Sequence, residues 1–372
     1  MEQRQGTMLP DYDNSLPCLA NSVLRHFGID TKGRKTLAAA DRFLDREYKN
    51  VVVILLDALG KNIIDGNLEE DGFFATHTET VISSVFPPTT VAATTSVQCG
   101  LEPVSHGWLG WDNYYPPIDK NVEVFTNKLT GTNISAADYY VAGHFCPYEN
   151  VVESIRKTGF AAHLVTPFSE LHPVSDKGVL RHTLRLCNEP GRKYIYSYWR
   201  EPDGTIHRYG CFSKETAKVV RNLERRVQAF CEKTEDTLVF VTADHGHKDT
   251  KTLHLSDVPG LLDCLLRGPS IEPRAMNFFV KSGKAREFAE RFQEAYGADF
   301  ILLTKEEVIE SGLFGSGPEH PLFRGMLGDF LAVATGDKAL FAKPGEDPGF
   351  KAMHAGLTKE EMQIPLIVYN GK

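Results

Sequence analysis

Acidic and imidazole side chains recur in this sequence where runs of apolar residues end. Such groups bind metal ions, and in open α/β sheets ligands bind where strands reach their carboxyl ends. Three motifs follow apolar runs, and a fourth motif comes just before the last apolar run of the chain. They contain Asp57 in LLDALG, Asp203 and His207 in EPDGTIHRYG, Asp244 and His245 in VTADHGH, and His354 in MHAGL.

Taken one at a time, these residues also have structural interpretations. An aspartate after a strand is often the N-cap of the next helix, and a lone histidine is usually a hydrogen-bonded structural residue. The four-residue spacing of Asp203 and His207 occurs widely by chance. The functional interpretation depends on the prediction that all of these residues reach one edge of one sheet.

A run of small, hydroxylated residues spans positions 83–107. The double proline at 87–88 cannot continue a helix, and the VAATTSV segment after it predicts a buried helix that ends at Gly100. Thr89 and Thr90 therefore lie at a helix start, where free N–H groups and the helix dipole favour an anion. Either threonine is a candidate nucleophile, and either also suits a helix N-cap.

Three aspartates, three histidines and one threonine supply oxygen and imidazole ligands without a thiolate. That set favours zinc in a hydrolytic site over a structural one, and manganese binds the same oxygen-rich set. Seven groups are too many for one tetrahedral metal and suit two. Two metal ions hold the entering and leaving oxygens of an in-line displacement at phosphorus, and a metal also activates a threonine hydroxyl. We therefore expect two divalent ions, zinc by preference.

Strand and helix patterns alternate along most of the chain. The run NVVVILL at 50–56 predicts a central strand that is buried on both faces. The alternation predicts an α/β fold with a doubly wound, mostly parallel sheet and helices on both faces. Further strands are expected at 160–165, 194–198 and 237–242, and helices at 16–27, 36–43, 149–157, 180–187 and 214–233.

The sequence changes in character after about residue 268, where short strands, short helices and glycine-rich loops follow one another. This pattern predicts a small α+β insertion that interrupts the main sheet. We expect a catalytic core over 1–267, the insertion over 268–347 and a return to the core over 348–372.

The composition is that of an ordinary globular protein, with 42% hydrophobic and 24% charged residues. A formal net charge of −8 argues against a nucleic-acid polymer as the partner. Seven scattered cysteines without C-x-x-C spacing favour reduced thiols. We see no signal-peptide core and no apolar run of membrane-spanning length, so we expect a cytoplasmic protein without membrane contact. The oligomeric state is left open.

In this order, the motifs resemble the type I phosphodiesterase/nucleotide pyrophosphatase branch of the alkaline phosphatase superfamily. The resemblance covers nearly the whole chain and implies an alkaline phosphatase-like fold. In that family the nucleophilic threonine lies ten residues before the glycine that opens G-L-x-P-x-x-H-G, which selects Thr90 when counted back from Gly100. The segments that carry the resemblance are LLDALG, FPPTTVAATTSVQCGLEPVSHG, PDGTIHRYG, TADHGH and MHAG.

The resemblance also implies a role for each site residue, with Thr90 phosphorylated during the reaction. It implies one metal on Asp203, His207 and His354, and a second on Asp57, Asp244 and His245 with Thr90 facing it.

One position departs from the family pattern. Nucleotide-hydrolysing members have an asparagine four residues past the glycine that matches Gly107, and this chain has Trp111 there. Asn113 takes that place only if the loop is shifted. A phosphate oxygen would therefore lack its usual donor, which leaves the substrate class open.

The peptide around Trp111 is unusually aromatic and either stacks on a flat substrate group or packs beside the sheet edge. His106 and His247 lie close to the site motifs, and we interpret both as structural. The aromatic residues are Trp108, Trp111, Tyr114 and Tyr115.

The sequence thus predicts a two-metal hydrolase of small phosphoric esters, favouring phosphodiester or nucleotide-like substrates. Phosphomonoester or phosphonate cleavage is the nearest alternative, and Arg200 and Arg208 are candidate cationic donors for a monoester. A phosphomutase would need a water-excluding lid, which the insertion offers. A non-catalytic metal-binding protein ranks last, because none of the seven positions is replaced.

Overall fold

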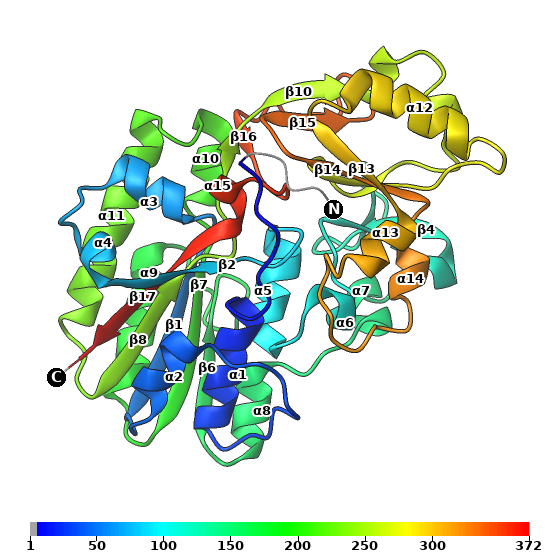
Figure 1. The fold of residues 1–372 in the computed structure, drawn as a ribbon. Helices are drawn as coiled ribbons and strands as arrows, with labels where there is room; N and C mark the ends of the chain where they lie inside the picture. Colours follow the sequence, from blue (N-terminus) through cyan, green and yellow to red (C-terminus); the bar gives the residue numbers. More distant parts are fainter. Residues whose placement is uncertain (1–5, 372) are drawn as a thin grey trace.

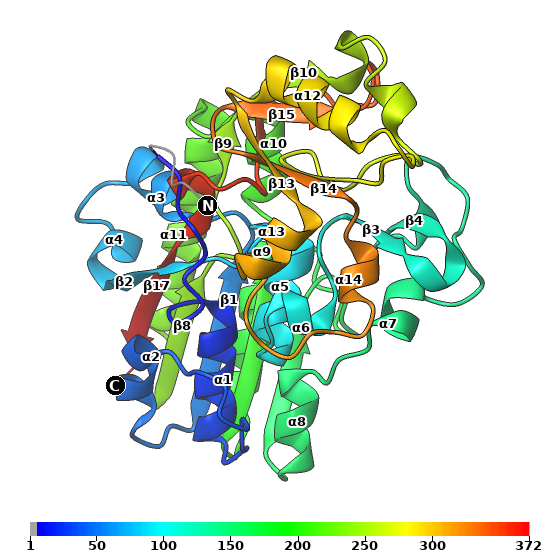
Figure 2. The same ribbon diagram turned by 45° about the vertical axis from the view of Figure 1, so that its right-hand side comes forward.

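The computed structural model describes residues 6–371 and contains two main sheets. The larger unit is built on a six-stranded sheet (Figures 1 and 2). Its strands run parallel except β17, which is antiparallel to both of its neighbours. In spatial order they are β2 (Thr78–Ser83), β17 (Gln363–Asn370), β8 (Thr237–Thr242), β1 (Asn50–Leu56), β7 (Lys193–Trp199) and β6 (Ala161–Val165).

Helices cover both faces of this sheet, as the all-buried strand β1 requires (Figure 1). The fold class predicted from the sequence is therefore confirmed. One layer holds α1 (Leu16–His26), α2 (Ala38–Leu44), α5 (Thr90–Cys99) and α8 (Val151–Lys157). The other holds α3 (Lys61–Asn67), α4 (Phe73–His77), α9 (Asp176–Asn188) and α11 (Lys214–Cys231), with α10 (Asp203–Tyr209) at the sheet edge.

Helix α11 shows how the sequence specifies these elements. The Ser213 side chain accepts a hydrogen bond from Thr216 N and so caps the helix start. Val220, Leu223 and Val227 recur at helical spacing, and all three are buried against the core.

The second sheet has seven strands and lies beside the carboxyl edge of the first (Figure 2). It contains four strands from the predicted 268–347 insertion, but three more come from 112–129. The smaller unit is thus assembled from two stretches of chain. In order the strands are β13 (Phe300–Thr304), β14 (Phe330–Ala334), β12 (Ala275–Phe278), β11 (Ser270–Glu272), β3 (Asp112–Tyr115), β4 (Lys120–Glu123) and β5 (Lys128–Leu129).

The division into core and insertion at residues 268 and 348 stays a prediction, and residues 1–5 and 372 lie outside the described part. α12 (Ala285–Tyr296) buries Phe288 and Phe292 against the second sheet. The short elements are α6 (Pro103–His106), α7 (Val141–Phe145), α13 (Lys305–Glu310), α14 (Phe323–Met326), α15 (Lys359–Met362), β9 (Lys248–Asp249), β10 (Lys251–His254), β15 (Lys338–Phe341) and β16 (Ala352–Met353).

A buried ion pair connects the second sheet to the segment before β17. Arg274 Nε lies 2.7 Å from Glu361 Oε1, and both side chains are fully buried. Removing one partner of such a pair costs about 3–5 kcal/mol, because the other charge is left buried.

Over residues 6–371, we find no helix that combines the length and the apolar character needed to span a bilayer.

Candidate active site

Three parallel strands of the first sheet have their carboxyl ends on the same side, and one aspartate of the site follows each of them. Asp57 directly follows β1, Asp244 follows β8, and Asp203 follows β7 and opens α10. The backbone joins two of these segments: Asp57 N donates to Trp199 O at 3.0 Å, and Asp203 N donates to Asp57 O at 3.2 Å. The sheet edge therefore fixes the relative positions of the carboxylates.

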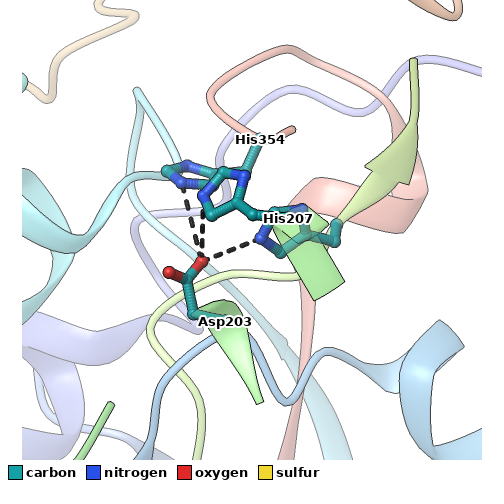
Figure 3. A group of neighbouring side chains, drawn as sticks. Asp203, His207 and His354 are labelled. Atoms are coloured by element: carbon teal, nitrogen blue, oxygen red, sulfur yellow. Dashed lines mark hydrogen bonds and ion pairs between the residues drawn. The ribbon is translucent and has the colours of Figure 1, made fainter. Parts of the chain in front are cut away.

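The first half of the site is a histidine cluster around Asp203 (Figure 3). Asp203 Oδ1 lies 3.3 Å from His207 Nε2, one helical turn further along α10, and 3.9 Å from His354 Nε2. Each ring is held by its other nitrogen, His207 Nδ1 by Ala352 O at 2.8 Å and His354 Nδ1 by Pro88 O at 3.1 Å. Backbone partners of this kind orient an imidazole so that Nε2 faces a metal.

His247 also belongs to this cluster, although its sequence context favoured a structural role. Its Nε2 lies 2.8 Å from Asp203 Oδ1, and the side chain is fully buried. Its ligand atom lies within 4.8 Å of those of Asp203, His207 and His354. His247 Nδ1 has no hydrogen-bond partner within the described chain. The available signal was the DHGH motif itself, which places a second imidazole two residues after His245.

The tight packing of Gly246 sets the path of that motif. A Cβ at this position would lie 1.9 Å from Glu360 O, so no larger side chain fits without a shift of the backbone. The two flanking histidines consequently point to different halves of the site, His247 toward Asp203 and His245 toward Asp57.

The second half is rich in carboxylates and contains the candidate nucleophile. His245 Nε2 lies 3.4 Å from Asp57 Oδ1 and 3.7 Å from Asp244 Oδ2. Thr90 Oγ1 lies 3.3 Å from His245 Nε2 and 3.5 Å from Asp57 Oδ1. His245 Nδ1 lies 3.0 Å from Gly246 O, which directs Nε2 toward the carboxylates. Asp57 also accepts a hydrogen bond from the Tyr198 hydroxyl.

The two adjacent threonines have different partners. Thr90 is the first residue of α5, and its hydroxyl faces Asp57 and His245. Thr89 is the extended N-cap residue, and its hydroxyl donates to Glu272 Oε1 at 2.6 Å. The structure therefore brings Thr90 to the cluster and turns the Thr89 hydroxyl away from it.

The electrostatics of the cluster fit a bound cation. Burial, together with repulsion from Asp244 and Asp203, raises the pKa of Asp57, and burial likewise raises the pKa of Asp244. Burial also lowers the pKa of His354, which disfavours an imidazolium there. In residues 6–371, no lysine or arginine forms an ion pair with these three aspartates.

The side chains of the cluster also fit a bound divalent cation. Asp244 Oδ2 is a buried acceptor without a hydrogen-bond partner in the described chain, which is costly unless another group satisfies it. Carboxylate and imidazole groups without a thiolate match a divalent cation in a hydrolytic site. The residues present therefore form a potential metal site. Its two groups are Asp203, His207, His247 and His354, and Asp57, Asp203 and His245.

The remaining candidates from the sequence either have other partners or are exposed. His106 is buried and hydrogen-bonded to Ser96 and to Trp108 N, as its structural interpretation requires. Arg200 and Arg208 are exposed. Asn113 is buried and donates to Gly107 O at 3.0 Å. Of the four aromatic residues, Trp111 is exposed, whereas Trp108, Tyr114 and Tyr115 are buried.

The sequence model of the type I phosphodiesterase/nucleotide pyrophosphatase family matches residues 51–357, which contain every predicted site residue from Asp57 to His354. The chain belongs to this family. It is accordingly a metal-dependent hydrolase of the phosphodiesterase and phosphatase type. No curated protein matches the sequence.

Solved structures share the fold at low sequence identity. Murine ectonucleotide pyrophosphatase/phosphodiesterase 5 superimposes with a TM-score of 0.64 at 15% identity, over 86% of this chain and 87% of that chain. An inactive threonine-to-alanine variant of the murine protein, in complex with AMP, gives 0.64 at 15% identity over 87% and 88%. Phosphonoacetate hydrolase from Sinorhizobium meliloti 1021, in complex with phosphonoformate, gives 0.64 at 16% identity over 86% and 90%.

Proposed function

We propose that this protein hydrolyses small phosphodiesters with two divalent metal ions and a covalent intermediate on Thr90. The observation that carries the proposal is the position of Thr90 Oγ1, 3.5 Å from Asp57 and 3.3 Å from His245 at the start of α5. An inactive threonine variant of the murine relative is consistent with such a role. The two ions would be held by Asp203, His207 and His354, and by Asp57, Asp244 and His245 with Thr90.

The bound ions would neutralise the phosphate charge and favour the alkoxide form of the threonine. Thr90 Oγ1 then forms a bond to phosphorus as the bond to the leaving alcohol breaks. The unbonded N–H groups at the start of α5 favour the phosphate anion through the helix dipole. Water next displaces phosphorus from Thr90, which releases the remaining monoester and restores the hydroxyl. The second ester group stays on phosphorus throughout.

The charge around the site favours a diester over a phosphomonoester or a phosphonate. A monoester dianion calls for cationic donors beyond the metals, and the two candidates, Arg200 and Arg208, are exposed. Glu272, buried beside Thr89, adds a further acidic group near the cluster. A diester carries a single negative charge and is repelled less by these acids.

Zinc is the proposed metal, because imidazole and carboxylate ligands without thiolate suit it in a hydrolytic site, and manganese is the alternative. A cytoplasmic location is also proposed. All seven cysteines are free and buried, which is typical of a reducing compartment. No nucleic-acid polymer or membrane partner is proposed.

The test compares bis-p-nitrophenyl phosphate with p-nitrophenyl phosphate, each with zinc and with manganese. We expect kcat/KM for the diester to exceed that for the monoester by at least about tenfold, which corresponds to about 1.4 kcal/mol of transition-state stabilisation. Faster cleavage of the monoester would replace this proposal with a phosphatase.

A further inference from the structure

A cavity of about 820 Å³ lies between the second sheet and the loop after β15. Acidic side chains dominate the charged part of its lining. Within the described residues, four of them form no ion pair, whereas the one arginine pairs with an aspartate of the same lining. The unpaired acids are Asp112, Glu123, Glu272 and Glu346, and the pair is Arg267 with Asp119.

Glu272 is the acid in this lining that lies deepest and nearest the reaction centre. Its side chain is 8% exposed, and Oε1 accepts hydrogen bonds from Thr89 Oγ1 at 2.6 Å and from Trp111 N at 2.8 Å. Oε2 accepts none from residues 6–371, although Glu272 lines the cavity. Oε2 is therefore free to accept a hydrogen bond from a group that enters the cavity.

The backbone around Glu272 holds it in this position. Ile271 has a φ of +76°, which is rare for a β-branched residue. Ile271 also pairs with Asp112 on β3, and a Cβ at Gly110 would lie 2.8 Å from Ile271 O. The close approach of these two segments fixes the distance between Glu272 and the loop that contains Trp111.

Two connections link the lining of the cavity to the residues around the candidate metal site. Glu272 binds the hydroxyl of Thr89, the residue immediately before Thr90. On the other side, Glu346 lines the cavity, and Phe350, four residues later, stacks on the His207 ring with the centroids 4.2 Å apart. The cavity lining is thus linked to the segments that carry Thr90 and His207.

We propose that the cavity binds the ester group that stays on phosphorus, and that this group carries a protonated amine which donates to Glu272 Oε2. The proposal rests on the phosphodiesterase function proposed above. Opposite charge accounts for recognition, since the four acids in the lining have no basic partner in the described chain, and a protonated amine both supplies N–H donors and favours their ionised form. Asn121 Oδ1, in the same lining, is a second acceptor without a donor in the described chain.

The test uses two diesters of nearly equal size, aminoethyl p-nitrophenyl phosphate and propyl p-nitrophenyl phosphate. Only the first carries a positive charge, and both release p-nitrophenol. In the zinc-loaded wild type, kcat/KM should favour the amine at least about tenfold, as expected for a charge-assisted hydrogen bond. In Glu272→Gln the ratio should fall toward one. Glu294→Gln, an exposed site on α12, is the matched control and should keep the wild-type ratio.

Calorimetric binding of the same esters to Thr90→Ala separates this proposal from the proposed function. Tighter binding of the amine with no hydrolysis of either ester by the wild type would leave the cavity assignment standing and overturn the diesterase. Equal hydrolysis and equal binding of the two esters would overturn the cavity assignment and leave the proposed diesterase function standing. A ratio unchanged in Glu272→Gln would show that another group recognises the amine and would also overturn the assignment.

Discussion

The two halves of the candidate metal site are built from different side chains. Around Asp203, imidazole nitrogens converge on a single carboxylate oxygen, and two of the rings are fixed by backbone carbonyls. Around Asp57, two carboxylates repel each other and face one imidazole and the Thr90 hydroxyl. Asp203 belongs to both groups and connects them.

This difference separates the tasks of the two halves. Imidazoles held in place by backbone carbonyls form a pre-oriented binding site. The carboxylate half has the greater need for a cation, because its acids are buried close together without a basic partner. The proposed nucleophile, Thr90, lies in that half, where a bound cation would have the most effect on the hydroxyl.

The largest expected effect comes from Thr90→Ala. Removing the attacking oxygen should lower kcat for bis-p-nitrophenyl phosphate by at least about a thousandfold, as loss of a covalent nucleophile does elsewhere. Thr89→Ala is the matched control, because its hydroxyl faces Glu272 and its loss should cost less than about tenfold. Steady-state kinetics decide, and comparable losses in the two variants would contradict the assignment of roles.

Asp203→Asn should affect metal content next most strongly. It weakens the oxygen toward which His207, His247 and His354 point, so the histidine half should lose its ion first. We expect the zinc content, measured by plasma emission spectrometry, to fall from about two ions per chain to about one. Retention of both ions would show that Asp203 is not required in either half.

His247→Gln tests whether the histidine half extends beyond the residues implied by family resemblance. Loss of this imidazole should weaken zinc binding by about tenfold to a hundredfold, whether it contacts the ion or orients Asp203. Competition with a chromophoric chelator measures the affinity. His182→Gln on α9 is the control, and equal affinities in the two variants would return His247 to a purely structural role.

The smallest effect concerns pH and stability at Glu272. Burial raises the pKa of its carboxyl from 4.5 to about 7, so the folded state holds the proton more tightly than the unfolded chain. This contribution to stability is complete below pH 4.5 and is lost as the pH rises through 7, by at most about 3 kcal/mol. Glu272→Gln should therefore gain stability relative to wild type over that range in urea unfolding. Profiles of stability against pH that run parallel in the variant and the wild type would contradict the raised pKa of Glu272.

Much of the fold followed from local sequence patterns. The buried run of β1 and the acids after β1, β7 and β8 were visible because a central strand is continuously apolar and a polar residue ends it. The start of α5 was visible through its prolines. Periodicity alone left Thr89 and Thr90 equivalent, and their distinct partners come from tertiary packing.

Other features depend on contacts between distant segments and had no local pattern. Strands β3–β5 join a sheet whose other members lie more than 140 residues later, so the insertion was predicted without them. Glu272 lies in no motif, and its role emerges only from its contact with Thr89, 183 residues away. His247 was visible as a residue, but the turn that directs it to Asp203 depends on packing against Glu360.

The stereochemical course at phosphorus tests the central claim most directly. A phosphorothioate diester of known configuration, hydrolysed by the zinc-loaded enzyme in heavy-oxygen water, gives a product whose configuration can be assigned. Two in-line displacements, the first by Thr90 and the second by water, predict overall retention. Inversion would show that water attacks phosphorus directly, and would contradict the covalent intermediate on Thr90.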